Sequence, residues 1–309
     1  MVTALHSNSY MRSRGTPSPS SEKSSKTGQC YLQIYFVNIY YCHYSSNSNK
    51  EIEMPAFCQC GFFSESLRKC VSVNVIVPQN SNSNIGVDNL ETKRKLFPVI
   101  YLLHGLSDDH TIWSRRTAVE LYASTYECII VMPDGGRSFY RNTVSGDRYK
   151  DFIAKDLPDF IENTFPAERN RENRFICGLS MGGYGALALA LEYPERYGKA
   201  AAFSSVADIQ YFVKNLSETH RKALFGDVEN LTGTDNDLFY LAEKTVKSPL
   251  RPELFLACGT EDFLYECNIR FRDHLNAIGY THKYIEKPGI HNWYFWNEQI
   301  QNALKFFME

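Results

Sequence analysis

The chain has 309 residues, which is long enough to bury a large hydrophobic core and excludes a miniprotein held together only by disulfides. Apolar residues (A, V, I, L, M, F, W, Y, C) make up 43% of the chain and charged residues (D, E, K, R) 22%, so neither a wholly disordered nor a collagen-like chain fits. The formal net charge is only -2, which gives no electrostatic reason to expect a nucleic acid or an anionic membrane as a partner.

The first 53 residues differ in character from the rest of the chain. Residues 1–30 are basic and rich in serine, a Tyr-rich run follows at 31–44, and a polar SSNSNK stretch comes next. This composition predicts a tail, not a domain. A transit peptide or a secretory signal is an alternative, but the apolar run is short and interrupted by amides. We expect residues 1–53 to be disordered or to precede a true start at Met54, and residues 54–309 to form one domain.

From Met54 onward, apolar strands alternate with amphipathic helices. Residues 71–78 (VSVNVIVP) alternate with period two and predict an antiparallel strand at the edge of a sheet. The later apolar runs are short and apolar on both faces, which is typical of buried parallel strands. These runs are residues 98–105, 128–136, 174–180, 199–206 and 252–262.

Segments with helical spacing separate these runs. The alternation predicts an α/β fold with a mostly parallel central sheet and helices on both faces. Residues 209–248 are helical in pattern but fall between two strands, so we expect a small helical cap insertion there. Ligands of such sheets bind beyond the carboxyl ends of the strands, where chemistry should be sought. The helical segments are residues 117–125, 149–163, 181–192, 265–278 and 293–307.

The segment Gly178-Leu179-Ser180-Met181-Gly182 follows one of these strands and precedes a helix rich in small residues. GxSxG in this context predicts a nucleophile elbow, a strained turn that lifts the serine hydroxyl out of the sheet. The glycines leave room for neighbouring backbone, and the helix N-terminus directs free N–H groups toward a developing oxyanion. Ser180 is therefore the predicted nucleophile.

A serine hydroxyl needs a base, and the base needs an orienting acid. In folds with this elbow the chain order is Ser, then acid, then His. Asp262 follows the apolar run PELFLACG, and His291 follows the strand-like run KYIEKPGI. Both the order and the positions at the sheet edge fit, so we expect Asp262 to be the acid and His291 the base.

Other acids and histidines compete for these two roles. Glu261 adjoins Asp262, but side chains alternate along an extended segment, so only one of the two can face the site. Asp208, which follows the preceding strand, is the fallback acid. His282 lies at the beginning of its strand and His274 lies within a helix, and both positions favour surface roles.

We predict a different role for the HG turn that follows residues 98–103. His104 fits a structural histidine bonded to backbone, whereas the backbone N–H of Leu106 is the expected partner of the Met181 N–H in an oxyanion hole. The sequence HGLSDDH at 104–110 could also suggest a metallohydrolase, but no further His or Cys cluster with ligand spacing completes a site. We expect no metal site.

Five longer segments together resemble one known family, from about Met54 to the C-terminus. This is the tributyrin esterase branch of the esterase D-like α/β-hydrolase superfamily, which also includes feruloyl and acetylxylan esterases, S-formylglutathione hydrolase and mycolyltransferases. The resemblance implies an α/β-hydrolase fold and a serine esterase, a carboxylic ester hydrolase without a cofactor, with Ser180, Asp262 and His291 as its catalytic triad. The segments are YLLHGLSDDHTIWSRRTAVELYA, MPDGGRSFYRNT, FICGLSMGGYGALALAL, GTEDFLYECNIRFRDHL and IHNWYFWNEQI.

The resemblance specifies the reaction mechanism more closely than it specifies the substrate. It implies a small acyl group, and therefore hydrolysis of short-chain acyl esters through a covalent acyl-enzyme. S-formylglutathione hydrolases commonly carry a cysteine soon after the HGL turn and the elbow GHSMGGHG, whereas this chain has Ser107, Asp108 and the elbow GLSMGGYG. These departures weaken the alternative of a thioester hydrolase. An acyltransferase that uses the same acyl-enzyme is the other alternative.

Five aromatic residues fall near the expected mouth of the site, where each either lines an acyl or alcohol pocket or belongs to the core. The expected partner is a small ester, with no nucleic acid and no membrane, and a homo-oligomer is left open. The aromatic residues are Trp113, Phe139, Tyr140, Phe263 and Trp293.

The cysteines bear on the cellular compartment. Their number, nine, is odd, and Cys128, Cys177 and Cys258 lie inside apolar runs, as buried free thiols do. This usage favours a reducing compartment and predicts a cytoplasmic location. Organelle targeting or secretion is the alternative if residues 1–53 are a targeting segment.

Overall fold

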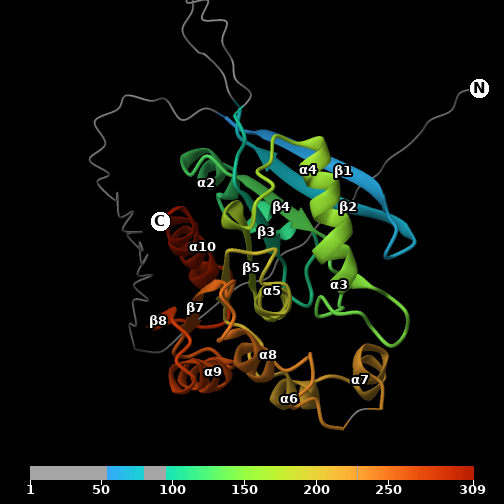
Figure 1. Cartoon of the computed structure of the whole chain (residues 1–309), viewed down its shortest axis with the longest axis vertical. Helices are drawn as coiled ribbons and strands as arrows, with labels where there is room; N and C mark the ends of the chain where they lie inside the picture. The colour runs from blue at the N-terminus through green and yellow to red at the C-terminus, as the bar shows by residue number, and fades with distance from the viewer. Residues whose placement is uncertain (1–53, 80–94, 228) are drawn as a thin grey trace, which may run out of the picture. The chain divides into compact units, whose positions relative to one another are not determined.

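A single eight-stranded sheet runs through the described part of the chain (Figure 1). The computed structural model describes residues 54–79, 95–227 and 229–309, all of which lie in one compact unit, Lys50–Glu309. The expectations for residues 1–53 fall outside the described residues. In spatial order the strands are β1 (Ala56–Ser64), β2 (Lys69–Val77), β4 (Ile129–Pro133), β3 (Val99–Leu103), β5 (Arg174–Leu179), β6 (Lys199–Phe203), β7 (Glu253–Gly259) and β8 (His282–Lys287).

The sheet is mostly parallel, as predicted. Only β1 with β2 and β2 with β4 pair antiparallel, and every later neighbour pair is parallel. Strands β3, β4 and β5 are buried along their whole length, because helices cover both of their faces.

The expectation that residues 71–78 form the edge strand is wrong. Strand β1 pairs along the whole of β2, from Ala56 opposite Val77 to Ser64 opposite Lys69, and therefore occupies the edge. Its side chains alternate between half-buried and exposed positions, which is the burial of an edge strand with one covered face. The sequence AFCQCGFFS places Gln and Cys in this alternation, so its apolar signal is weaker than that of VSVNVIVP.

Helices pack on both faces of the sheet. Along β3, Val99, Tyr101 and Leu103 join a core cluster that also contains residues of α4, α5, α8 and α9. Ile100 and Leu102 point to the other face, where α1, α2 and α10 pack. The helices are α1 (Ile112–Arg116), α2 (Val119–Thr125), α3 (Tyr149–Asp151), α4 (Leu157–Thr164), α5 (Met181–Glu192), α6 (Ile209–Phe212), α7 (Glu218–Phe225), α8 (Leu238–Thr245), α9 (Tyr265–Ala277) and α10 (Trp293–Met308).

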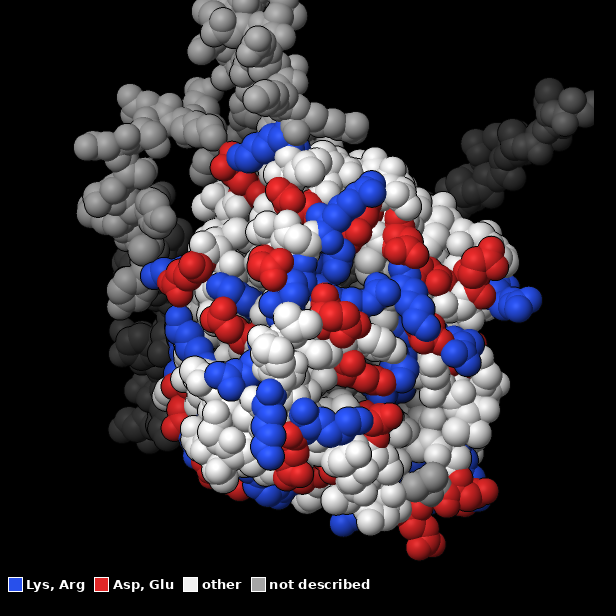
Figure 2. Space-filling model, in the orientation of Figure 1, with Lys and Arg blue, Asp and Glu red and all other residues white. Residues whose placement is uncertain are grey.

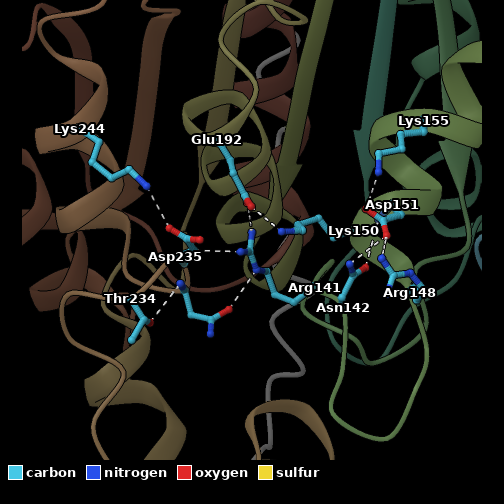
Figure 3. A network of polar contacts seen from close by, with 11 residues as sticks. Arg141, Asn142, Arg148, Lys150, Asp151, Lys155, Glu192, Thr234, Asp235 and Lys244 are labelled. Carbon is cyan, nitrogen blue, oxygen red and sulfur yellow. Dashed lines mark hydrogen bonds and ion pairs between the residues drawn. The ribbon is translucent and has the colours of Figure 1, made fainter.

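The segment between β6 and β7 contains α6, α7 and α8, as its helical pattern indicated, and these helices lie together in Figure 1. The buried side chain of Arg141 ties this segment to the rest of the fold (Figure 3). The Arg141 guanidinium binds the Glu192 carboxylate at the end of α5 at 2.7 Å, and also donates to the Asn236 side chain at 3.1 Å and to the Asp235 carbonyl at 2.9 Å. One side chain therefore joins the loop after β4, helix α5 and the segment before α8.

The surface in Figure 2 carries basic and acidic side chains interspersed over the visible face, with neither sign forming a continuous field. Within the described ranges, no helix combines the length and the apolar character needed to span a membrane. The cysteines Cys128, Cys177 and Cys258 are buried free thiols, as their apolar surroundings predicted.

Candidate active site

Ser180 stands at the junction of β5 and α5 in a backbone conformation that few side chains adopt. Its φ is 53° and its ψ is -116°, in a region where non-glycine residues are strained. A Cβ atom on Gly178 would lie 2.5 Å from the carbonyl carbon of Gly182, and one on Gly182 would lie 2.6 Å from the carbonyl oxygen of His104. Both positions therefore require glycine, and the GxSxG pattern follows from backbone crowding around this serine.

The structure brings the three predicted side chains together. His291, in the turn between β8 and α10, has its Nε2 atom 3.1 Å from the Ser180 hydroxyl oxygen. Its Nδ1 atom lies 3.0 and 2.9 Å from the two carboxylate oxygens of Asp262, which follows β7. The Asp262 side chain is completely buried, while that of His291 is 19% exposed. The arrangement forms one hydrogen-bonded line that opens to solvent at the imidazole and the serine.

The surroundings of Asp262 favour its charged form. Burial acts to raise the pKa of this carboxyl, but the hydrogen bond and charge of His291, the N–H of Leu264 and the Ser204 hydroxyl lower it more, so the pKa falls below its ordinary value. A carboxylate that stays ionised fixes the proton of His291 on Nδ1. The Nε2 atom is then left free to accept a proton from Ser180.

The competing side chains are engaged elsewhere. Glu261 is exposed, and its backbone N–H donates to the Gly289 carbonyl in the loop before His291. Asp208 caps α6 through the Tyr211 N–H at 2.9 Å and pairs with Arg270 at 2.9 Å. His282 and His274 each lie by a backbone carbonyl, that of Tyr280 at 2.8 Å and that of Phe239 at 3.3 Å.

His104 has the structural environment that was predicted for it. Its Nδ1 atom lies 2.7 Å from the Gly105 carbonyl oxygen, and its Nε2 atom accepts the Gly135 N–H at 2.8 Å. A ring that donates from Nδ1 and accepts at Nε2 is the neutral tautomer. His104 is 1% exposed and joins the turns after β3 and β4.

The loop after β3 approaches Ser180 closely. A Cβ atom on Gly105 would lie 3.9 Å from the Ser180 Cβ, so the backbone of Leu106 passes beside the nucleophile. Within the described ranges, no hydrogen bond from the N–H groups of Leu106 and Met181 to a backbone or side-chain acceptor is found. Both donors are available for a group bound beside Ser180.

The five aromatic residues predicted near the mouth divide into two sets. Trp113, Phe139 and Tyr140 are at most 1% exposed and belong to the core, where the indole N–H of Trp113 donates to the Leu103 carbonyl and the Tyr140 hydroxyl to the His104 carbonyl. Phe263 is 66% exposed and its ring centre lies 4.5 Å from that of His291. Trp293 is half-buried and packs edge-on against Trp113.

Among residues 54–79, 95–227 and 229–309, no group of three or more His, Cys, Asp or Glu side chains is placed to hold a metal ion.

Comparison with known proteins identifies the family. Residues 64–307, well over half of the chain, match the family described as "Putative esterase". This chain belongs to that family. It is also similar to an acetyl esterase of Caldicellulosiruptor saccharolyticus, with 30% identity over 266 residues that cover 81% of this chain and 97% of the relative.

Solved structures agree with this assignment. The fluorophosphonate-binding serine hydrolase F of Staphylococcus aureus is 30% identical to this esterase, with a TM-score of 0.77 over 83% of this chain and 100% of that one. An S-formylglutathione hydrolase of Staphylococcus aureus, also 30% identical, has a TM-score of 0.74 at the same coverage. The α/β-hydrolase fold and the resemblance to the esterase D-like superfamily are confirmed, and the chain is a serine carboxylic ester hydrolase.

Two further residues of this esterase contact the hydrogen-bonded line and were not anticipated. Ser204 is buried, has a φ of 44°, and its hydroxyl lies against Asp262. Trp296 packs edge-on against the His291 imidazole with ring centres 4.8 Å apart. The only available signal was the spacing of Trp293 and Trp296, which a helix places on neighbouring parts of one face.

Proposed function

We propose that this esterase hydrolyses short-chain acyl esters through a covalent acyl-enzyme, with Ser180 as nucleophile, His291 as general base and Asp262 as the orienting acid. The observation that carries the proposal is the hydrogen-bonded line from the Ser180 hydroxyl through His291 to Asp262, with distances of 3.1 and 2.9 Å. Both distances lie within the range that proton transfer and orientation require.

The reaction proceeds in two halves. The Ser180 oxygen attacks the ester carbonyl carbon while His291 Nε2 accepts the hydroxyl proton, and the bond to the leaving alcohol breaks as His291 returns that proton to the alcohol oxygen. Water then attacks the acyl-serine, again giving its proton to His291. The serine oxygen leaves with this proton, and the carboxylic acid is released. Asp262 stabilises the imidazolium that forms in each half.

The tetrahedral intermediates carry a negative oxygen that needs donors. The backbone N–H groups of Leu106 and Met181 are assigned to this oxyanion, and each such donor contributes about 3 kcal/mol to transition-state stabilisation. Because these donors belong to the main chain, changes of side chain at either position should be tolerated.

A small acyl group is favoured by two considerations. One relative is described as an acetyl esterase, and it is 30% identical to this chain over most of both chains. In addition, Trp113, Phe139 and Tyr140 are buried in the core, so three of the five aromatic candidates are not open to an acyl chain.

A kinetic series tests the proposal. Hydrolysis of p-nitrophenyl acetate, butyrate and octanoate should show a burst of nitrophenol and a preference for the two shorter acyl groups. Ser180→Ala should lose this activity, and an organophosphate should label Ser180 covalently, whereas Ser145→Ala, at an exposed loop position, should behave as wild type. Wild-type turnover by Ser180→Ala would end the proposal.

Thioester hydrolysis is the second candidate, because one neighbour at 30% identity is an S-formylglutathione hydrolase. The same acyl-enzyme would form, with a thiolate as the leaving group. S-formylglutathione should be compared with p-nitrophenyl acetate under identical conditions. A higher kcat/KM for the thioester favours this candidate, and a new ester formed from an added alcohol faster than free acid would favour an acyltransferase.

A further inference from the structure

The side chain of Asp108 lies beside the proposed nucleophile. Its Oδ2 atom would lie 3.0 Å from a Cβ atom on Gly105, and the Ser180 Cβ would lie 3.9 Å from the same point. The carboxylate and the serine therefore both face the same point beside the Gly105 backbone. Asp108 is half-buried, and it follows the proposed oxyanion donor Leu106 by only two positions.

No basic side chain neutralises this carboxylate at close range within residues 54–79, 95–227 and 229–309. His104 and, more weakly, Arg116 act on it through their charge without forming an ion pair with it, Gly105 supplies a backbone N–H, and the charge of Asp109 acts in the opposite direction. Burial raises the pKa of Asp108, and these neighbours offset the rise only in part. A half-buried carboxylate with little compensation produces a negative potential in the space beside Ser180.

The adjacent residue provides a contrast. Asp109 is exposed, and its Oδ1 atom accepts hydrogen bonds from the Thr111 N–H at 2.8 Å and the Thr111 hydroxyl at 2.6 Å. Its carboxylate is occupied in closing the turn before α1. Of these two acids, Asp108 is therefore the one whose carboxylate faces the side of Gly105 that Ser180 also faces.

Aromatic rings lie near the His291 end of the hydrogen bond between Ser180 and His291. Phe263 lies against His291 and is largely exposed, and Trp293 at the start of α10 is half-buried. A carboxylate together with aromatic rings is the combination that attracts alkylammonium groups, through charge and through the negative faces of the rings.

We propose that Asp108 is a specificity-determining residue that makes this esterase favour substrates with a positively charged group near the reacting carbonyl over neutral esters of the same shape. This inference rests on the proposed ester hydrolysis at Ser180. It proposes that the esterase selects its substrates by their charge as well as by the size of the acyl group. Esters with a negative charge in the same place should be poor substrates.

A matched pair of esters tests the charge without changing the shape. Acetylcholine and 3,3-dimethylbutyl acetate differ only in that a quaternary nitrogen replaces a quaternary carbon. Acid release is followed in a pH-stat at neutral pH and low ionic strength, and kcat/KM is measured for both esters. The wild type should favour acetylcholine by about tenfold, and added salt should reduce this ratio.

Two variants assign the ratio to one side chain. Asp108→Asn should bring the ratio of the two kcat/KM values close to one while retaining hydrolysis of 3,3-dimethylbutyl acetate. Asp108→Ser should give the same result, and it serves as a second variant in case the asparagine amide perturbs the loop. Asp109→Asn removes the same charge one position away and should keep the wild-type ratio. A wild-type ratio near one, or a ratio unchanged in both Asp108 variants, overturns the inference.

The outcome is separable from that of the proposed function. If wild type hydrolyses the neutral ester and Ser180→Ala does not, the proposed function stands whatever the ratio is. If neither ester is hydrolysed and Ser180 is not labelled by an organophosphate, the proposed function itself fails.

Discussion

The indole Nε1–H of Trp296 donates a hydrogen bond to the Ser204 hydroxyl, with 3.1 Å between nitrogen and oxygen. The same indole packs against the His291 ring, and the Ser204 hydroxyl hydrogen-bonds to Asp262. One residue of α10 therefore contacts the proposed base directly and the proposed acid through a single hydroxyl. Ser204 and Trp296 are therefore suited to hold the side chains of Asp262 and His291 in their relative orientation, which is a positioning role.

Ser204→Ala should lower kcat/KM by about tenfold, because a buried hydrogen bond to a charged group is lost. The Ser204 hydroxyl lowers the pKa of Asp262, so its removal should raise that pKa, which an NMR titration of the carboxyl measures. Ser205→Ala is the matched control, since the Ser205 hydroxyl is buried next door without a hydrogen-bond partner in the part of the chain that the structure describes. An unchanged pKa of Asp262 in Ser204→Ala would contradict the positioning role.

Gly259→Ala should displace the loop that carries His291. A Cβ atom there would lie 2.1 Å from the carbonyl oxygen of Gly289, which is backbone and cannot swing away. We expect loss of esterase activity and a decrease of about 3 kcal/mol in the free energy of unfolding. Gly61→Ala in β1 meets nothing closer than 3.8 Å and should retain both. Urea titration and p-nitrophenyl acetate turnover of the two variants decide the matter.

Glu192→Ala should destabilise the fold strongly, because it leaves the Arg141 guanidinium buried without its carboxylate. The two side chains are 4% and 14% exposed, and removing one partner of such a pair costs about 3–5 kcal/mol. Glu298→Ala breaks the exposed pair with Lys287 and should cost less than about 1 kcal/mol. The free energy of unfolding of both variants is measured by chemical unfolding. Equal decreases in the two variants would show that the buried pair stabilises the fold no more than the exposed pair does.

Asp262→Asn should change how stability depends on pH. Since the pKa of Asp262 is lower in the folded protein than its ordinary value, its ionised form stabilises the fold above the unfolded pKa, and this contribution is lost as pH falls through the folded pKa. The difference in unfolding free energy between wild type and variant should be largest near neutral pH and shrink below roughly pH 4. Parallel stability curves from pH 7 to pH 3 would be inconsistent with the lowered pKa.

Much of the fold was predictable from the sequence because its signals are local. The apolar runs closed by Gly or Asp gave the parallel strands, and the elbow around Ser180 is a short pattern with one structural solution. Asp262 and His291 could be chosen because chain order and the sheet edge restrict where an acid and a base can stand.

The remaining features depend on which distant segments meet. Strand β1 was missed because its alternation includes polar side chains, and its partner β2 was therefore placed at the edge. Nothing in the sequence around Phe139 and Tyr140 distinguishes a pocket wall from a core, since both rings are covered by segments far away in the chain. The roles proposed for Ser204 and Asp108 depend on which segments fold next to Asp262 and Ser180, and no spacing in the sequence reveals that.

The position of His291 in the chain has a consequence for synthesis. Ser180 and its neighbouring backbone donors are translated well before the imidazole, which precedes the last helix, α10. A nascent polypeptide whose final segment is still inside the ribosomal exit tunnel therefore holds a serine with no proton acceptor. On the proposed mechanism, ester cleavage therefore begins only after the segment that carries His291 has been synthesised and has folded against the sheet.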